Sequence, residues 1–522
     1  LVEAYGGWIE ARRADLSRLR GRRLGTAEEL LRLAGVARKR IGRGIETLEN
    51  DADALDAFRM ANRAVARALV QRNKLEDPRW HPFQLAFILL NLPGLADPRD
   101  AEREIVDLLF FPTGGGKTEA YLGLAAFAMV LRRLRHRDEK EPPGAGAGAG
   151  AGVSVIMRYT LRLLTLDQLG RAAGLVCALE LERLNDESRY GAFPFEIGLW
   201  VGKAATPNHM GRKGDGREDT ARWKVIQFQR DPKGRPSPIP LENCPWCGTA
   251  YTPDSFTLLP DTDNPADLRV VCQNFECEFS GERGLPILSV DEPIYRRLPA
   301  FLIATVDKFA SLPFVGESGA LLGSERRGIA PPDLIIQDEL HLISGPLGTM
   351  AALYETAIEA LCIREVDGKQ VRPKIIASTA TVRRAQDQIQ ALFARSLTQI
   401  FPPPGPDRRD SFFARTRPAA EVPARLYLGI ASQGRSPKVT MRKAWLALMG
   451  AAERSYRDAG GHKNENNPAD PYMTVVGYFN SLRELGGARR ILEEEVQNTV
   501  GSYGMRKRVG ETEGLFHDRT EF

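Results

Sequence analysis

Residues 105–134 read IVDLLFFPTGGGKTEAYLGLAAFAMVLRRL and predict a strand, a glycine-rich loop and a helix, in that order. The run IVDLLFF has the apolar character of a buried strand, PTGGGKT holds too many glycines for regular structure, and the remainder has the spacing of an amphipathic helix. Strand, glycine loop and helix are the context that a phosphate-binding loop requires. The stretch therefore predicts a nucleotide site on a parallel sheet covered by helices.

The residue types in this loop suit a nucleoside triphosphate. Glycines let backbone N–H groups turn toward the β-phosphate, Lys117 can bridge the outer phosphates, and the Thr118 hydroxyl can ligate Mg²⁺. Phe111 departs from the full pattern, which has a small residue there, and a chance glycine-rich turn before a helix is the alternative interpretation. The predicted ATP-binding residues of the loop are Thr113, Gly114, Gly115, Gly116, Lys117 and Thr118.

A second stretch, DLIIQDELHLI at 333–343, predicts an apolar strand that ends in two acids. Asp338 is expected to hold Mg²⁺ through water, and Glu339 to orient or deprotonate the attacking water. Alone, such a pair is often only the start of a helix, where acids favour the dipole. Together with the glycine loop it predicts Lys117, Asp338 and Glu339 as catalytic residues.

These two stretches and four others resemble the motifs of superfamily 2 helicases of the DExH kind. Asp338 to His341 resembles motif II, and STAT at 378–381 resembles motif III, which implies coupling roles for His341, Ser378, Thr379 and Thr381. RYTLRLLTLDQ at 158–168 resembles motif Ia and ATVDKFA at 304–310 the next backbone-contact segment, which implies nucleic-acid contacts by Arg158, Thr160, Arg162 and Thr305. WHPFQLAFILLNL at 80–92 resembles the segment whose glutamine, here Gln84, reads adenine. For His341 and Gln84, a purely structural role is the alternative.

Four of the six cysteines predict a metal site. Cys244-x₂-Cys247 in NCPWCG and Cys272-x₄-Cys277 in VCQNFECEF have the spacing of a zinc ribbon, whose four thiolates leave no open position for catalysis. The predicted Zn²⁺ is therefore structural. A pair of disulfides is the alternative, and it fits poorly with the cytoplasmic location expected below.

Composition and charge limit the class of protein. The chain has 522 residues, 43% hydrophobic and 27% charged, with a net charge of only +5. No apolar run has the length of a membrane span and the first residues lack a secretory signal, so a cytoplasmic protein without a membrane is expected. Residues 1–74 hold 16 Lys and Arg against 10 Asp and Glu. A basic strip at 203–235, with Trp223 and Phe228, is either a nucleic-acid contact or a solvated loop.

The predicted fold is α/β, a RecA-like parallel sheet with helices on both faces. In the N-terminal region, Thr26 is a plausible helix N-cap. The stretch PPGAGAGAGAG at 142–152 predicts a flexible surface linker. The stretch VVGYFNSLRELGGARR at 475–490 resembles motif IV and predicts a strand, a turn and a helix. No later Arg-x-x-x-x-Arg spacing follows, so the second domain is expected to be incomplete and catalysis weak. The expected domains are a basic helical region at 1–75, a RecA-like ATPase domain at 76–400 with the basic strip and zinc-ribbon insertion at 203–285, a linker at 401–420, and the start of a second RecA-like domain at 421–522.

Together these stretches resemble the large helicase subunit of DISARM bacterial anti-phage defence systems. The resemblance implies an ATP-dependent, DNA-directed motor that acts with a partner protein of the same system. An ATP-gated clamp or loading platform, which recruits a partner without processive unwinding, is the alternative hypothesis. A P-loop enzyme that phosphorylates a small substrate is disfavoured by the motif Ia, III and IV matches. The residues themselves do not choose DNA over RNA.

Overall fold

The chain divides into two compact units, Leu1–Thr416 and Arg417–Phe522, which we describe separately. The division falls inside the segment expected to be a linker, 401–420. The computed structural model describes residues 1–522 with the exception of 113, 138–149, 160–165, 203–204, 324–327, 380–383, 408, 423–424, 508, 511, 513 and 521–522.

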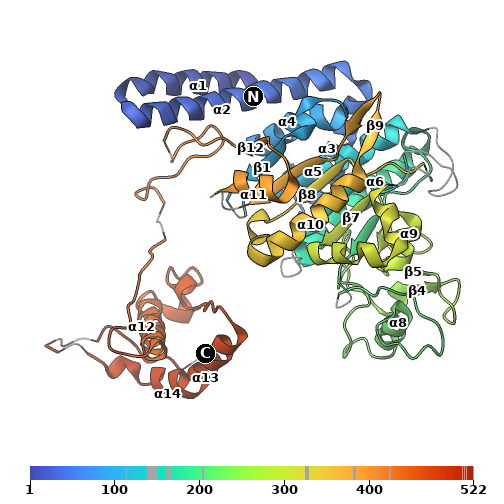
Figure 1. Cartoon of the computed structure of the whole chain (residues 1–522). Coiled ribbons are helices and arrows are strands. Elements are labelled where there is room, and N and C mark those ends of the chain that lie inside the picture. The colour runs from blue at the N-terminus through green and yellow to red at the C-terminus, as the bar shows by residue number, and fades with distance from the viewer. Residues whose placement is uncertain are drawn as a thin grey trace. The chain divides into compact units, whose positions relative to one another are not determined.

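The first unit is built on an eight-stranded sheet in the order β12-β1-β11-β8-β2-β7-β3-β6, in which every neighbouring pair is parallel. Figure 1 shows this sheet with helices packed around it. The apolar strands expected within 105–111 and 333–337 are both present, and the α/β prediction is confirmed. The strands are β1 (Val106–Phe110), β2 (Val155–Tyr159), β3 (Ile197–Trp200), β6 (Ile287–Leu288), β7 (Phe301–Thr305), β8 (Leu334–Gln337), β11 (Lys374–Thr379) and β12 (Thr398–Phe401).

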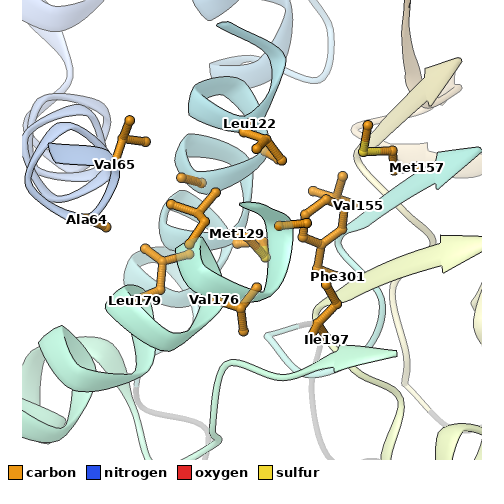
Figure 2. Packing of buried hydrophobic residues seen from close by; sticks show 14 of the residues in the cluster. Ala64, Val65, Leu122, Met129, Val155, Met157, Val176, Leu179, Ile197 and Phe301 are labelled. Carbon is orange, nitrogen blue, oxygen red and sulfur yellow. The ribbon is translucent and has the colours of Figure 1, made fainter. Parts of the chain in front are cut away.

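Alternating side chains of these strands enter two separate cores. On β2, Val155 and Met157 join one apolar cluster, whereas Ile156 between them joins the other. Parallel sheets are covered on both faces, so both sets of alternating positions are apolar. Figure 2 shows the first cluster, where Met129 and Val176 from two helices point toward the side chains of the strands.

Helices cover both faces of the sheet, as predicted. The first face carries α4 (Pro82–Ala96), α5 (Lys117–Arg135) and α6 (Leu166–Asn185), together with α3 (Ala52–Asn73). The second face carries α9 (Asp291–Arg297), α10 (Gly345–Cys362) and α11 (Ala385–Phe393). Short helical turns complete the unit at η1 (Leu16–Arg18), η2 (Ala101–Glu104), α7 (Glu187–Tyr190), η3 (Pro253–Ser255), η4 (Val306–Phe314), η5 (Gly316–Leu322) and η7 (Leu340–Leu342).

The N-terminal helices α1 (Val2–Asp15) and α2 (Gly21–Asn50) belong to the first unit. The predicted N-cap at Thr26 is wrong, because α2 begins at Gly21 and the Thr26 hydroxyl donates to the Arg22 carbonyl inside the helix. Arg40 of α2 reaches Asp107 at the start of the sheet, with Nη1 donating to Oδ1 at 2.6 Å. Lys374 Nζ donates to the other oxygen of Asp107, also at 2.6 Å. These buried charges fasten the N-terminal region to the strand that leads into the glycine loop.

The insertion between β3 and β6 is a small module. It contains α8 (Ala221–Arg230) and an antiparallel pair, β4 (Phe256–Leu259) and β5 (Asp267–Val270). Phe228, one of the aromatic residues of the basic strip, is buried against Phe256 with ring centroids 5.5 Å apart, so it is not available to a nucleic acid. Elsewhere in the unit, β9 (Arg364–Val366) and β10 (Lys369–Val371) form a second antiparallel pair.

The second unit is helical where the structure describes it. Its helices are α12 (Pro437–Asp458), α13 (Leu482–Ile491) and α14 (Gln497–Val500), with short turns η8 (Gly461–Lys463), η9 (Asp470–Tyr472), η10 (Leu492–Val496) and η11 (Tyr503–Met505). The helix expected after VVGYFNS is present as α13, but the expected strand is not formed. Val476 and Tyr478 of that segment are 66% and 92% exposed. A strand needs neighbours to satisfy its backbone, and the described part of this unit provides none.

Candidate nucleotide site and four-cysteine cluster

The glycine loop joins β1 to α5 in the order that the sequence predicts. Gly114 and Gly116 have positive φ angles of 80° and 86°, which glycine adopts without the steric cost of a side chain. Gly116 is the N-cap of α5, so Lys117 and Thr118 open the helix. Thr113 lies outside the described residues. The glycine loop thus ends at the N-terminus of α5, which suits an anion. The Gly115 N–H is used inside the loop, where it donates to the Pro112 carbonyl at 3.0 Å.

Lys117 is the side chain whose environment points most directly to a ligand. The residue is only 7% exposed, and its Nζ is buried without a hydrogen-bond partner among the described residues. Burying an unpaired ammonium group is costly unless something binds it. An anion in the glycine loop would provide that partner, so the residues present fit a nucleotide phosphate.

Asp338 follows β8 and lies beside the start of α5. Its Oδ1 accepts from the Ser378 hydroxyl at 2.5 Å and from the Glu339 backbone N–H at 2.9 Å. Its Oδ2 accepts from the Tyr121 hydroxyl at 2.7 Å, and the Tyr121 oxygen lies 3.1 Å from Thr118 Oγ1. The structure therefore brings together Thr118, Asp338 and Ser378 from three different elements. Hard divalent cations prefer such hydroxyl and carboxylate oxygens, so these residues could hold Mg²⁺.

Tyr121, which joins Thr118 to Asp338, was not among the residues predicted from the sequence. It lies one turn after Thr118 on α5, on the same face of that helix. Burial, reinforced by the nearby Tyr159 and Asp338, raises the pKa of Tyr121 well above its usual range, so its hydroxyl keeps its proton. The signal in the sequence was a phenol one turn after the loop, followed by an apolar run of the helix.

Glu339 and His341 lie next to the end of β11. The Glu339 backbone is in the left-handed region with φ of 46°, a strained conformation that is concentrated at functional sites. Glu339 Oε2 lies 3.3 Å from His341 Nδ1, which lies 3.2 Å from Thr379 Oγ1. The predicted coupling residues of the two motifs are thus in contact, with Thr381 outside the described residues. Their coupling role stays a prediction.

A cavity of about 850 Å³ opens beside the glycine loop. Gln84 is buried in its wall, where Nε2 donates to the Gly116 carbonyl at 2.7 Å and Oε1 accepts from the His81 backbone N–H at 2.8 Å. Phe111 stacks on Phe83 with ring centroids 3.8 Å apart, which accounts for an aromatic residue where the loop pattern has a small one. The cavity has the size of a small-molecule site.

Two of the predicted nucleic-acid contacts are buried instead. Arg158 is 1% exposed, and its Nη1 donates to Glu355 of α10. Its guanidinium also lies over the Phe309 and Phe393 rings. Thr305, at the end of β7, is likewise 1% exposed. The structure therefore does not present Arg158 or Thr305 to a nucleic acid. Thr160 and Arg162 lie outside the described residues.

The four cysteines of the insertion converge as the spacing predicts. Their Sγ atoms all lie within 4.8 Å of one another, and those of Cys247 and Cys272 are 3.4 Å apart. The other two ligands are Cys244 and Cys277. Four thiols from two hairpin-like turns at this separation fit a tetrahedral zinc ion. Nearby, Arg67 of α3 lies over the Trp246 ring, so the module packs against the N-terminal helices.

Comparison with known proteins agrees with the resemblance that the motifs carry. Over 88% of its length the chain is 38% identical to DISARM protein DrmA of Bacillus paralicheniformis. The predicted resemblance to DrmA is confirmed. The chain spans 44% of the length of that relative. No family model matches the chain.

Solved structures give weaker likenesses. The DUF1998 helicase MrfA matches with a TM-score of 0.33 and 12% identity, over 65% of this chain and 32% of that chain. MrfA bound to DNA matches with a TM-score of 0.32 and 11% identity, over 65% of this chain and 29% of that chain. These likenesses are too low to extend the description of the fold. Among the described residues, no helix is both long and apolar enough to cross a membrane.

Proposed function

We propose that this chain carries the ATP-binding half of a superfamily 2 helicase or translocase that acts on DNA in bacterial anti-phage defence. The observation that carries the proposal is the buried, unpartnered Lys117 Nζ in a glycine loop beside Thr118 and Asp338. The identity with DISARM protein DrmA supports a role in that defence system. DNA as the substrate, a protein partner from the same system and a cytoplasmic location are parts of the proposal.

Each residue of the site has a role in this proposal. The N–H groups of Gly114 and Gly116 and the Lys117 amine bind the phosphates of ATP, and the wall that contains Gln84 receives the base. Mg²⁺, which Thr118 and Asp338 would hold, neutralises phosphate charge when bound. Glu339 accepts a proton from the attacking water and thereby directs hydrolysis.

The four cysteines would hold a structural Zn²⁺ that fixes the insertion. With all four positions taken by thiolates, the ion has no open site for substrate. We assign it no part in hydrolysis.

The clamp hypothesis stays open because Arg158 and Thr305 are buried. Two of the contacts that a stepping motor was expected to make are therefore missing from the described surface. Glu339→Gln distinguishes the two functions: a motor stops moving along DNA, whereas a clamp stays locked on DNA with ATP bound and still recruits its partner.

The test is ATP binding and steady-state ATP hydrolysis by the chain alone and with single-stranded DNA, duplex DNA or single-stranded RNA. We expect a form of DNA to stimulate hydrolysis and Lys117→Ala to abolish both binding and hydrolysis. Lys369→Ala, which removes an exposed lysine of β10 outside the basic strip, serves as the matched control and keeps both. ATP binding that survives Lys117→Ala would refute the assigned site, and stimulation by RNA alone would refute the choice of DNA.

A further inference from the structure

The Tyr121 hydroxyl occupies the space between the two side chains expected to hold a cation. It donates to Asp338 Oδ2 at 2.7 Å and lies 3.1 Å from Thr118 Oγ1. Tyr121 is 2% exposed, so water does not compete for these bonds. The three side chains therefore form a continuous hydrogen-bonded chain.

The protons in this chain can be assigned from its chemistry. A phenol carries one proton, and a hydrogen bond to a carboxylate is shorter and stronger than one to a neutral hydroxyl. The Tyr121 proton therefore goes to Asp338, the nearer and charged partner. The Thr118 hydroxyl is then the donor to the Tyr121 oxygen. As a result, the lone pairs of Thr118 Oγ1 stay free for a cation.

The Asp338 carboxylate is fixed from both sides. Ser378 and the Glu339 backbone N–H hold Oδ1, and Tyr121 holds Oδ2. Each carboxylate oxygen can accept more than one hydrogen bond, so Oδ2 retains capacity for a cation-bound water. Among the described residues, the contact that Oδ2 keeps without the Tyr121 hydroxyl is a weaker one, to Gln168 Nε2 at 3.4 Å.

We propose that Tyr121 is a positioning residue that orients Thr118 and Asp338 toward a divalent cation bound with the nucleotide. The inference rests on the nucleotide site proposed above. It assigns a role to a side chain that touches neither the phosphates nor the base. The competing explanation is that Tyr121 only fills the core between α5 and the sheet.

Tyr121→Phe separates these explanations, because it removes the hydroxyl and keeps the ring. The measurement is the Kd for ATP in excess Mg²⁺ and again in EDTA. We expect Tyr121→Phe to bind ATP about 10-fold more weakly with Mg²⁺, about 1.4 kcal/mol, and equally well in EDTA. Tyr295→Phe, which removes a buried hydroxyl of α9 in the core on the other face of the sheet, leaves both values unchanged.

A second variant keeps the test independent of packing. If Tyr121 acts through Thr118, then Thr118→Ala and Tyr121→Phe are non-additive, and the double variant loses little more Mg²⁺-dependent affinity than Thr118→Ala. Additive losses would overturn the inference. So would an equal loss in Mg²⁺ and EDTA, which indicates a packing role, or no loss at all.

The outcomes also separate this inference from the proposed function. If the wild-type chain binds no ATP in either buffer, the nucleotide site itself is refuted, and this inference with it. If the wild type binds ATP more tightly in Mg²⁺ than in EDTA, and Tyr121→Phe shows the same ratio of Kd values, only the role of Tyr121 is refuted.

Discussion

The nucleotide site and the four-cysteine cluster are assembled in different ways. Lys117 and Asp338 lie far apart in the sequence, and the register of a parallel sheet brings them together. The cysteines lie within residues 244–277, and the loops of one small module bring them together. The first site takes its geometry from the whole sheet, whereas the second depends on the metal it would hold. Damage to the cluster should therefore cost local folding, and damage to the nucleotide site should cost binding alone.

The largest effect is expected from Cys272→Ser. Zinc binding supplies about 10 kcal/mol or more of apparent folding free energy in small zinc modules, so losing a ligand should unfold the insertion. We expect the variant to lose its zinc and to be cleaved within 203–285 by protease, while ATP still protects the sheet. The measurements are zinc content and limited proteolysis.

Cys362→Ala is the control, because this buried cysteine lies on α10 outside the cluster. It should keep one zinc ion per chain. A Cys272→Ser protein that retains zinc and resists protease would show that the cluster is not the metal site.

Acid should destabilise the sheet that carries the nucleotide site by protonating Asp333, which immediately precedes β8. Arg132 and Arg364 contact its two oxygens at 2.7 and 2.9 Å. Burial opposes ionisation, but these guanidinium groups outweigh it and hold the pKa of Asp333 well below its ordinary value. A carboxyl with a lowered folded pKa stabilises the protein above its unfolded pKa, near 3.9, and loses that contribution as the pH falls below it.

The measurement is the thermal midpoint between pH 6 and pH 3. The thermal midpoint of the wild type should fall steeply below about pH 4. Asp333→Asn should have a lower midpoint than the wild type at pH 6, but its midpoint should fall less between pH 6 and pH 3. Both proteins lose zinc in acid, so the loss of zinc affects both midpoints alike. The difference between the two slopes therefore reports the contribution of Asp333. Parallel slopes would show that Asp333 does not anchor the sheet.

The position of a residue could be predicted from the sequence where its neighbours are close in the chain or are set by the order of the strands. The glycine loop, the strand before Asp338 and the four cysteines are of this kind, and the structure places them as predicted. The burial of Arg158 and Thr305 could not be predicted from the sequence, and their contact with nucleic acid stays a prediction. Arg158 lies near the end of β2 and Thr305 ends β7. The sheet is buried on both faces, so the pattern of apolar residues does not indicate which of their side chains reach solvent.

Two further differences have physical causes that pattern alone does not contain. The strand expected at the motif IV segment has high β-propensity, but propensity is realised only against neighbouring strands. Tyr121 looked like one more core residue of α5, because its partner Asp338 is distant in the sequence. Only the register of β8 against β2 and β11 brings that carboxylate to it.

The smallest effect on stability is expected from Lys117→Met, which gives the sharpest contrast with Cys272→Ser. Methionine keeps the length of the side chain and removes an ammonium group that is buried without a partner among the described residues. The free energy of unfolding without nucleotide should therefore stay within about 1 kcal/mol of the wild type or rise, because a desolvated charge has been removed. ATP with Mg²⁺ should raise the thermal midpoint of the wild type and leave that of the variant unchanged, since only a ligand that binds the native state stabilises it. If the free energy of unfolding without nucleotide fell by several kcal/mol, Lys117 would support the fold. The nucleotide site would then not differ from the four-cysteine cluster in its contribution to folding.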